Sequence, residues 1–409
     1  MNREVATGLS RLLEPHTAEE FLASSWGQTY RHIRGRAGKF AHLLPWERLN
    51  DILRQHRLDF PRLRLMREGR ALPVNSYLRH TTAARTKQPI PRLQPVKFTG
   101  ELRAGATIVL DAVDELHEPL EELAAGLERF FRERIQINSY AGWHTSRGFD
   151  LHWDDHDVFI LQVAGRKHWR IYGETRPHPL GGDTDNPKPT GTPLWEATLE
   201  DGDLLYIPRG WWHVAEPLEE PTLHLTVGIH KRTGVDLLTW LAGQLRASET
   251  FRRDLPRFAS HAERAAHVRQ LGAELLAAWS EEQLLERYFA ELDAMAEPRA
   301  AHLSLPWSAT AGLVPRGEAK RVRLLAPRPL DLQVAEGAVE FSCHKKRWRF
   351  AAGALPVLEL LADGHACSVA ELCAAAGEGL DEETVRLFVG ELIGHGLVAV
   401  VAERTEPRV

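Results

Sequence analysis

The feature that most constrains the fold of this 409-residue chain is a succession of short strand-like segments over residues 133–232. Each segment is apolar throughout or alternates apolar with polar residues, and Gly, Pro and Asp separate it from the next. Because those separating residues favour turns, the pattern predicts many short strands in a sandwich or barrel. The segments are Ile135–Tyr140, Asp157–Val163, His168–Tyr172, Leu204–Ile207 and Thr222–His230.

The chain before this region predicts helices and a few strands. Apolar residues at three- and four-residue steps predict helices at 18–23 and 45–55, and early acids with late arginines predict another over 115–132. Residues 60–110 contain many prolines and predict loops and edge strands, with strands at Leu63–Met66, Val96–Thr99 and Thr107–Leu110.

After this region the apolar residues recur at helical rather than strand-like spacing. Leucines at helical spacing predict an Ala-rich helical segment over 235–297, followed by a break with several prolines. Near the C-terminus, Ser368 and Glu371 form a capping box that opens one helix. Asp381 opens a second helix that runs to about Gly394, and a strand follows over Leu397–Val401. Helix, helix, strand in this order is typical of a winged helix.

Composition excludes some classes of protein. The formal net charge of −5 argues against nonspecific coating of nucleic acid, although residues 61–104 are locally rich in Lys and Arg. The 3 cysteines form neither a disulfide framework nor a CxxC zinc pattern. The N-terminus lacks the apolar core of a signal peptide, and no apolar run is long enough to span a membrane, so we expect a cytoplasmic protein.

Eight of the 20 histidines fall between His144 and His230, in the strand-rich region, and this clustering indicates a metal site. In the segment GFDLHWDDHDVF, His152 and Asp154 are two residues apart, which places both on one face of a strand. His213, after a Pro-Arg-Gly turn, supplies a second imidazole from a distant strand. Two histidines and one carboxylate on one face of an octahedron are typical of non-haem Fe(II) oxygenases.

The residues alone leave rival ligands open. His156 shares the face of His152 and Asp154, and two further acids, Asp155 and Asp157, are adjacent. A lone H-x-D is also common by chance. The Gly-Asp turn before His213 and a cation, Lys167, at the start of a following strand favour the metal interpretation.

At these residues the sequence resembles the JmjC-domain ribosomal oxygenases of the cupin-4 type. Their motif is approximately N-x-Y, then H-x-D-D-x-D-x-F-x-x-Q-x-x-G-x-K-x-W-x-x-Y, then G-D-x-L-Y-x-P-R-G-x-x-H. The corresponding segments here are Asn138–Tyr140, His152–Tyr172 and Gly202–His213. One departure follows the N-x-Y tyrosine, where the family usually has Thr-Pro and this chain has Ala-Gly-Trp-His.

The resemblance implies an α+β fold with a double-stranded β-helix (JmjC/cupin) core. It implies four parts: an N-terminal extension packing on the core (1–110), the catalytic core (111–234), a helical dimerisation segment (235–300) and a C-terminal winged helix (315–409). It makes His152, Asp154 and His213 the ligands of Fe(II), and Lys167 the partner of the distal carboxylate of the cosubstrate 2-oxoglutarate. Asn138 and Tyr140 would line the cosubstrate pocket, and no side chain is required as a general base.

The reaction implied by the resemblance uses O₂ to decarboxylate 2-oxoglutarate and to hydroxylate a side chain of a ribosomal protein, with arginine favoured and histidine possible. It also implies a homodimer. A JmjC oxygenase acting on another peptide or on a small molecule is an alternative, as is a non-catalytic binding module. The basic cluster at 344–349 permits nucleic-acid binding, but the acidic second helix favours a protein partner for the winged helix.

Overall fold

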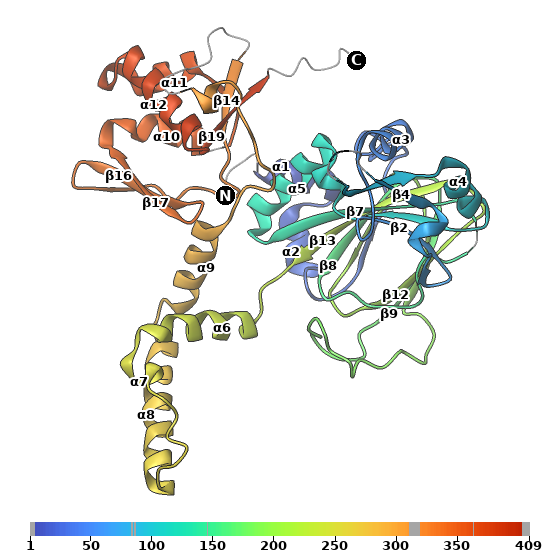
Figure 1. The fold of residues 1–409 in the computed structure, drawn as a ribbon, viewed down its shortest axis with the longest axis horizontal. Helices are drawn as coiled ribbons and strands as arrows, with labels where there is room; N and C mark the ends of the chain where they lie inside the picture. Colours follow the sequence, from blue (N-terminus) through green and yellow to red (C-terminus); the bar gives the residue numbers. More distant parts are fainter. Residues whose placement is uncertain are drawn as a thin grey trace. The chain divides into compact units, whose positions relative to one another are not determined.

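The computed structural model describes residues 5–402 apart from 83, 84, 86, 145, 311–319 and 363. The chain divides into two compact units, Met1–Lys231 and Arg232–Val409 (Figure 1). No helix within the described ranges is both long and apolar enough to cross a membrane. The finer subdivision into four parts stays a prediction.

The first unit is built on two antiparallel sheets. The larger sheet has the order β1-β11-β8-β13-β7-β6-β2-β3, and the smaller has the order β10-β9-β12. The strands of the larger sheet are β1 (Arg31–Ile33), β2 (Leu63–Arg67), β3 (Arg70–Ala71), β6 (Thr107–Leu110), β7 (Arg134–Gly142), β8 (Asp157–Ala164), β11 (Leu204–Ile207) and β13 (Thr222–His230). Those of the smaller sheet are β9 (Lys167–Gly173), β10 (Trp195–Leu199) and β12 (Trp212–Pro217), and β4 (Leu78–Thr82) pairs separately with β5 (Pro89–Leu93).

Strand β8 shows how the sheets and helices share the core. Val158 and Ile160 pack with the smaller sheet, in a cluster that includes Trp169 and Ile171 of β9. Phe159 and Leu161 point to the opposite face and join the cluster that the helices cover. Because side chains alternate across a strand, an uninterrupted apolar run can serve both layers. The strands expected at 204–207 and 222–230 have the predicted bounds, whereas β10 and β12 were not predicted.

The helices of the first unit pack against the larger sheet or at its edge. They are α1 (Val5–Leu13), α2 (Ala18–Ser24), α3 (Trp46–Gln55), α4 (Pro95–Arg103) and α5 (Glu118–Phe131), with 3₁₀ turns at Val74–Ser76 and Val113–Glu115. The expected strand Val96–Thr99 is wrong, because those residues belong to α4. Pro95 stands at the first turn of α4, where its fixed φ favours a helix, and Phe98 is buried beneath it.

The second unit contains a helical segment and a C-terminal part with its own core. Its helices are α6 (Gly234–Gln244), α7 (Glu249–Arg252), α8 (His261–Trp279), α9 (Leu284–Met295), α10 (Leu355–Ala362), α11 (Val369–Ala376) and α12 (Glu382–Gly394). Its sheets are β18 (Cys367–Ser368)–β14 (Lys320–Leu324)–β19 (Val398–Ala402) and β15 (Gln333–Ala335)–β16 (Ala338–Cys343)–β17 (Lys346–Ala351). The predicted capping box at Ser368 and the helix start at Asp381 are confirmed.

Candidate metal centre

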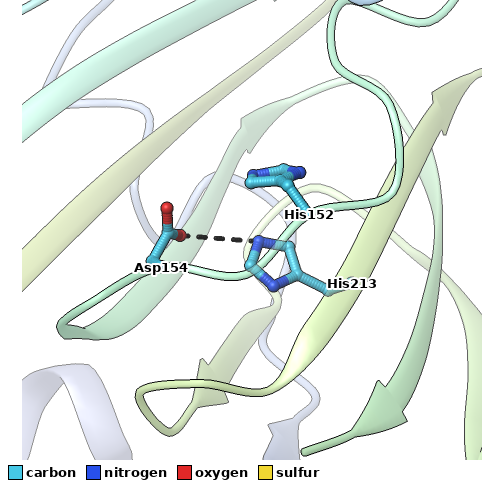
Figure 2. Close-up of side chains that lie close together, drawn as sticks. All are labelled: His152, Asp154 and His213. Atoms are coloured by element: carbon cyan, nitrogen blue, oxygen red, sulfur yellow. Dashed lines mark ion pairs between the residues drawn. The ribbon is translucent and has the colours of Figure 1, made fainter. Parts of the chain in front are cut away.

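The structure brings His152, Asp154 and His213 together at the mouth of the two-sheet core (Figure 2). His213 lies on β12, and its backbone forms an isolated antiparallel bridge with His152. The two hydrogen bonds of that bridge, N to O, are 3.1 and 2.8 Å long. Residues 152–154 were expected to form a strand, and this is wrong, because the bridge involves His152 alone. Asp154 therefore lies in a loop. The Gly210 amide holds this loop by donating a hydrogen bond of 2.9 Å to the Asp154 backbone carbonyl.

Backbone carbonyls fix the tautomer of both histidines. The Nδ1 atom of His152 lies 2.8 Å from the carbonyl of Asp150, and Nδ1 of His213 lies 2.9 Å from the carbonyl of Trp211. A carbonyl only accepts, so each Nδ1 carries the proton and each Nε2 presents a lone pair. In metal sites, a hydrogen bond of this kind from the second ring nitrogen orients the ligand.

The three ligand atoms lie close enough to share one ion. They are within 4.8 Å of one another, and Nε2 of His213 is 3.5 Å from Oδ2 of Asp154 (Figure 2). Burial and the charge of His152 lower the pKa of His213 to about 4, so its imidazole is neutral at pH 7. A neutral imidazole is the form that binds a metal.

The rival ligands have other partners. The buried carboxylate of Asp157 pairs with Lys231 at 2.8 Å and accepts hydrogen bonds from the Tyr206 hydroxyl and the Arg209 amide. Asp155 accepts a hydrogen bond from His156 at 2.9 Å. His156 and Asp155 form, with His230, a second group of side chains that could hold an ion. The carboxylate of Asp157 is thus occupied by an ion pair and hydrogen bonds within the protein. Asp155 and His156 belong to the second group of potential ligands, apart from His152, Asp154 and His213.

A cavity of about 240 Å³ opens beside the three residues. Side chains from both sheets line it, and they include the predicted cosubstrate contacts Lys167 and Tyr140. Its other polar or aromatic lining residues are Arg64, Thr107, Phe149, Trp169, His224 and Thr226. The cavity is smaller than the roughly 300–1,000 Å³ of drug-sized ligand pockets, so it suits a small metabolite.

Lys167 provides an unpaired cation inside this cavity. It is 7% exposed, and burial lowers the pKa of its ammonium to about 7. Among the described side chains, none places a carboxylate against it, and its Nζ lies 6.0 Å from the ring centroid of Trp169. A buried cation without a counterion is costly, so the site is suited to receive an anion.

Two further polar atoms beside Lys167 lack partners in the part of the chain that the structure describes. They are Nε1 of Trp169 and Nδ1 of His224. Burial, followed by the charge of Lys167, holds the pKa of His224 well below its usual range, so His224 is neutral. The sequence interpretation did not name these residues. His224 lies opposite Tyr140 in the β13–β7 pair, and this strand register is what brings it to the cavity.

Asn138 and Tyr140 occupy different places. The ring of Tyr140 lines the cavity and stacks on His224, with 4.9 Å between centroids. Burial raises the pKa of the Tyr140 hydroxyl, which therefore stays protonated. Asn138 is not among the described residues that line the cavity; its Oδ1 accepts from the Ala112 amide at 2.9 Å, and its side chain hydrogen-bonds to Tyr140. Asn138 and Tyr140 are two residues apart on β7 and therefore share one face of the sheet.

Comparison with known proteins finds similarity to a described domain in the region of this site. Residues 115–237 match the model of the JmjC domain. Ribosomal oxygenase 1 from Gallus gallus is 30% identical over 228 residues, which are 54% of this chain and 36% of that protein. The "bifunctional lysine-specific demethylase and histidyl-hydroxylase NO66" of Aedes aegypti is 29% identical over 234 residues, 56% of this chain and 35% of the relative. The chain spans about a third or less of the length of the curated relatives it matches.

Solved structures share the fold over nearly the whole chain. Escherichia coli YcfD aligns with a TM-score of 0.55 at 18% identity and covers 94% of this chain and 98% of its own. A second structure of YcfD, described as a ribosomal oxygenase in complex with cobalt and 2-oxoglutarate, aligns with a TM-score of 0.54. The predicted JmjC/cupin core is therefore confirmed, while the winged helix and the dimer stay predictions. The chain carries a JmjC domain on a fold that it shares with Escherichia coli YcfD.

Proposed function

We propose that this protein is an Fe(II)- and 2-oxoglutarate-dependent oxygenase that hydroxylates a side chain of a ribosomal protein. The observation that supports this most is that one cavity holds both a His-Asp-His cluster and a buried cation without a counterion. The first is a donor set suited to Fe(II), and the second is suited to a carboxylate. A non-catalytic module would need neither feature.

The residues present fit an iron ion. His152 and His213 would hold it through Nε2 and Asp154 through a carboxylate oxygen, which leaves positions for 2-oxoglutarate and O₂. The bound iron would supply the chemistry that couples decarboxylation of 2-oxoglutarate to oxidation of a substrate C–H bond. The carbonyls of Asp150 and Trp211 keep both rings in the ligating tautomer, so the protein contributes a preorganised donor set.

Lys167 and its neighbours would orient the cosubstrate. The distal carboxylate of 2-oxoglutarate would pair with the Lys167 ammonium, and the unpartnered Nε1 of Trp169 is a further donor in the same cavity. Tyr140, held protonated by burial, can also donate. The small volume of the cavity excludes bulk water from these contacts, which strengthens each of them.

A ribosomal protein is the proposed substrate because of the relatives that share the fold. YcfD is described as a ribosomal oxygenase, and the NO66 relatives are named histidyl-hydroxylases. We favour arginine as the target residue and keep histidine as the second possibility. Action on another peptide or on a small molecule is the alternative, and nothing in the geometry of the site favours it.

Mass spectrometry of ribosomal proteins tests the substrate. We expect one ribosomal protein to carry one additional oxygen atom in cells that contain this gene and to lose it when the gene is deleted. Restoring the wild-type gene should restore the oxygen, and restoring the Asp154→Ala form should not. Unchanged masses for all ribosomal proteins after deletion would contradict the ribosomal substrate. Fragmentation of the modified peptide identifies the residue and distinguishes a hydroxylated side chain from a demethylated one.

We also propose that the helical segment forms a homodimer. Helix α8 buries none of its residues, and its apolar side chains Val268, Leu276 and Trp279 are 43–65% exposed. Exposed apolar surface on this scale is typical of an interaction site. Light scattering at micromolar concentration should give twice the 46.1 kDa chain mass, and Leu276→Asp should shift it to the monomer. A monomeric wild-type protein would contradict the proposal.

A further inference from the structure

A groove of about 890 Å³, larger than the metal cavity, lies elsewhere in the first unit. Helix α3 and the loop after it form one wall, β5 and α4 form the other, and residues of β2 and β6 form part of the floor. Figure 1 shows α3, β4 and α4 at the same end of this unit. None of the roles proposed above uses this groove.

The groove and the metal cavity lie on opposite faces of one sheet. On β2, Leu63 lines the groove and Arg64 lines the metal cavity. On the neighbouring β6, Ile108 lines the groove and Thr107 lines the metal cavity. Because consecutive side chains on a strand point to opposite faces, the sheet separates the two cavities. A molecule in the groove therefore does not occupy the space of 2-oxoglutarate.

The floor of the groove is apolar and aromatic. Leu49, Leu58 and Phe98 are buried beneath it. Trp46 and Trp143, both partly exposed, line it with their ring centroids 5.6 Å apart. A concave apolar surface with a few polar groups at its edge is the usual form of a small-molecule site.

The rim of the groove is positively charged. Arg57, Arg92 and Arg103 are exposed along it, and none of the described residues that line the groove is acidic. Other arginines of the basic segment 61–104 are paired, as Arg62 is with Glu115 and Arg67 with Glu101. The three rim arginines have no acidic partner among the described residues. Some arginines of the basic segment are thus paired with acids, and two others, Arg92 and Arg103, stand with Arg57 at the rim of the groove.

The segment that departs from the ribosomal-oxygenase motif, Ala-Gly-Trp-His after Tyr140, contributes to the same groove. Trp143 and His144, the last two residues of the Ala-Gly-Trp-His segment, both line the groove. This departure therefore places an aromatic side chain, Trp143, on the face of the sheet opposite the metal cavity.

We propose that this groove binds a small amphipathic anion, with an apolar body on the aromatic floor and one carboxylate or phosphate head at the arginine rim. The volume falls within the range of about 300–1,000 Å³ that small-molecule sites occupy. The absence of acidic lining residues among those described selects an anion over a neutral or cationic ligand. The inference is independent of the proposed oxygenase activity, because it uses none of the metal-site residues.

Isothermal titration calorimetry with decanoate and with decyl phosphate tests the groove. We expect saturable one-to-one binding of at least one of the two, and no saturable binding of decanol or decyltrimethylammonium. The double variant Arg92→Glu/Arg103→Glu should weaken that binding about 5-fold or more, since it removes two exposed ion pairs with the anion and adds two repulsive charges. Thr99→Trp, which fills the groove from α4 without changing charge, should also abolish the binding.

Two controls separate this site from others. Arg70→Glu changes an exposed arginine of the same basic segment outside the groove and should leave the affinity unchanged. Lys167→Met should also leave it unchanged, because Lys167 lies in the metal cavity. The proposal is overturned if neither anion binds, if decanol binds equally well, if Thr99→Trp has no effect, or if binding is lost in Lys167→Met. Thermal unfolding of each variant verifies that it folds.

Discussion

Replacing Asp154 by alanine should lower iron-dependent turnover of 2-oxoglutarate by at least about 100-fold. Loss of a residue that merely supports a metal ligand typically costs about 10–100-fold in metal affinity or activity, and loss of a ligand removes a direct bond. His152→Ala should have the same effect, because its Nε2 lone pair faces the same point. Succinate release measured with saturating Fe(II) gives the activity, and a Co(II) titration gives the metal affinity independently of turnover.

His156→Ala is the matched control for the metal assignment. His156 lies two residues from Asp154 and belongs to the second group of potential ligands, with Asp155 and His230. We expect His156→Ala to keep turnover within a few-fold of wild type, since His156 does not line the metal cavity. If Asp154→Ala stays active, or if His156→Ala is as inactive as Asp154→Ala, then the iron ligands have been assigned to the wrong residues.

Several strands of the core could be predicted because their apolar period and their turn residues are local signals, whereas β10 and β12 were missed. The strand at 204–207 is bounded by Gly202 and Pro208, and its predicted ends are those of β11. Helix α4 was missed because Val96 and Thr99 favour strands, whereas burial of Phe98 against the sheet decides in favour of the helix. Tertiary packing overrides local propensity at such short segments.

The proximity of His152, Asp154 and His213 could be predicted, but the reason given for it was wrong in part. Spacing on a strand does not bring Asp154 beside His152; the bridge between His152 and His213 and the loop held by Gly210 do so. The sequence also carries no signal for the tautomers, which depend on the carbonyls of Asp150 and Trp211. Contacts between residues far apart in the chain, such as Tyr140 with His224, likewise required the register of β7 and β13.

Lys167→Met should raise the KM for 2-oxoglutarate roughly 10- to 150-fold and change kcat much less. A hydrogen bond to a charged group contributes about 1.5–3 kcal/mol, and a contact to the distal carboxylate is made equally in the ground state and the transition state. Methionine keeps most of the volume and removes only the charge. Steady-state kinetics at saturating iron separate the two constants. An unchanged KM would show that Lys167 does not contact the cosubstrate.

Lys167 should also make the wild-type KM for 2-oxoglutarate depend on pH. Burial lowers the pKa of Lys167 to about 7, so the free enzyme loses the binding-competent ammonium as the pH rises above 7. A bound carboxylate favours the charged form and raises that pKa, so binding takes up a proton. The KM should therefore rise with pH above 7, by up to about 10-fold per pH unit. The Lys167→Met variant has no ammonium to lose, so its KM should stay flat over the same range. A sloping KM in that variant would assign the titration to another group.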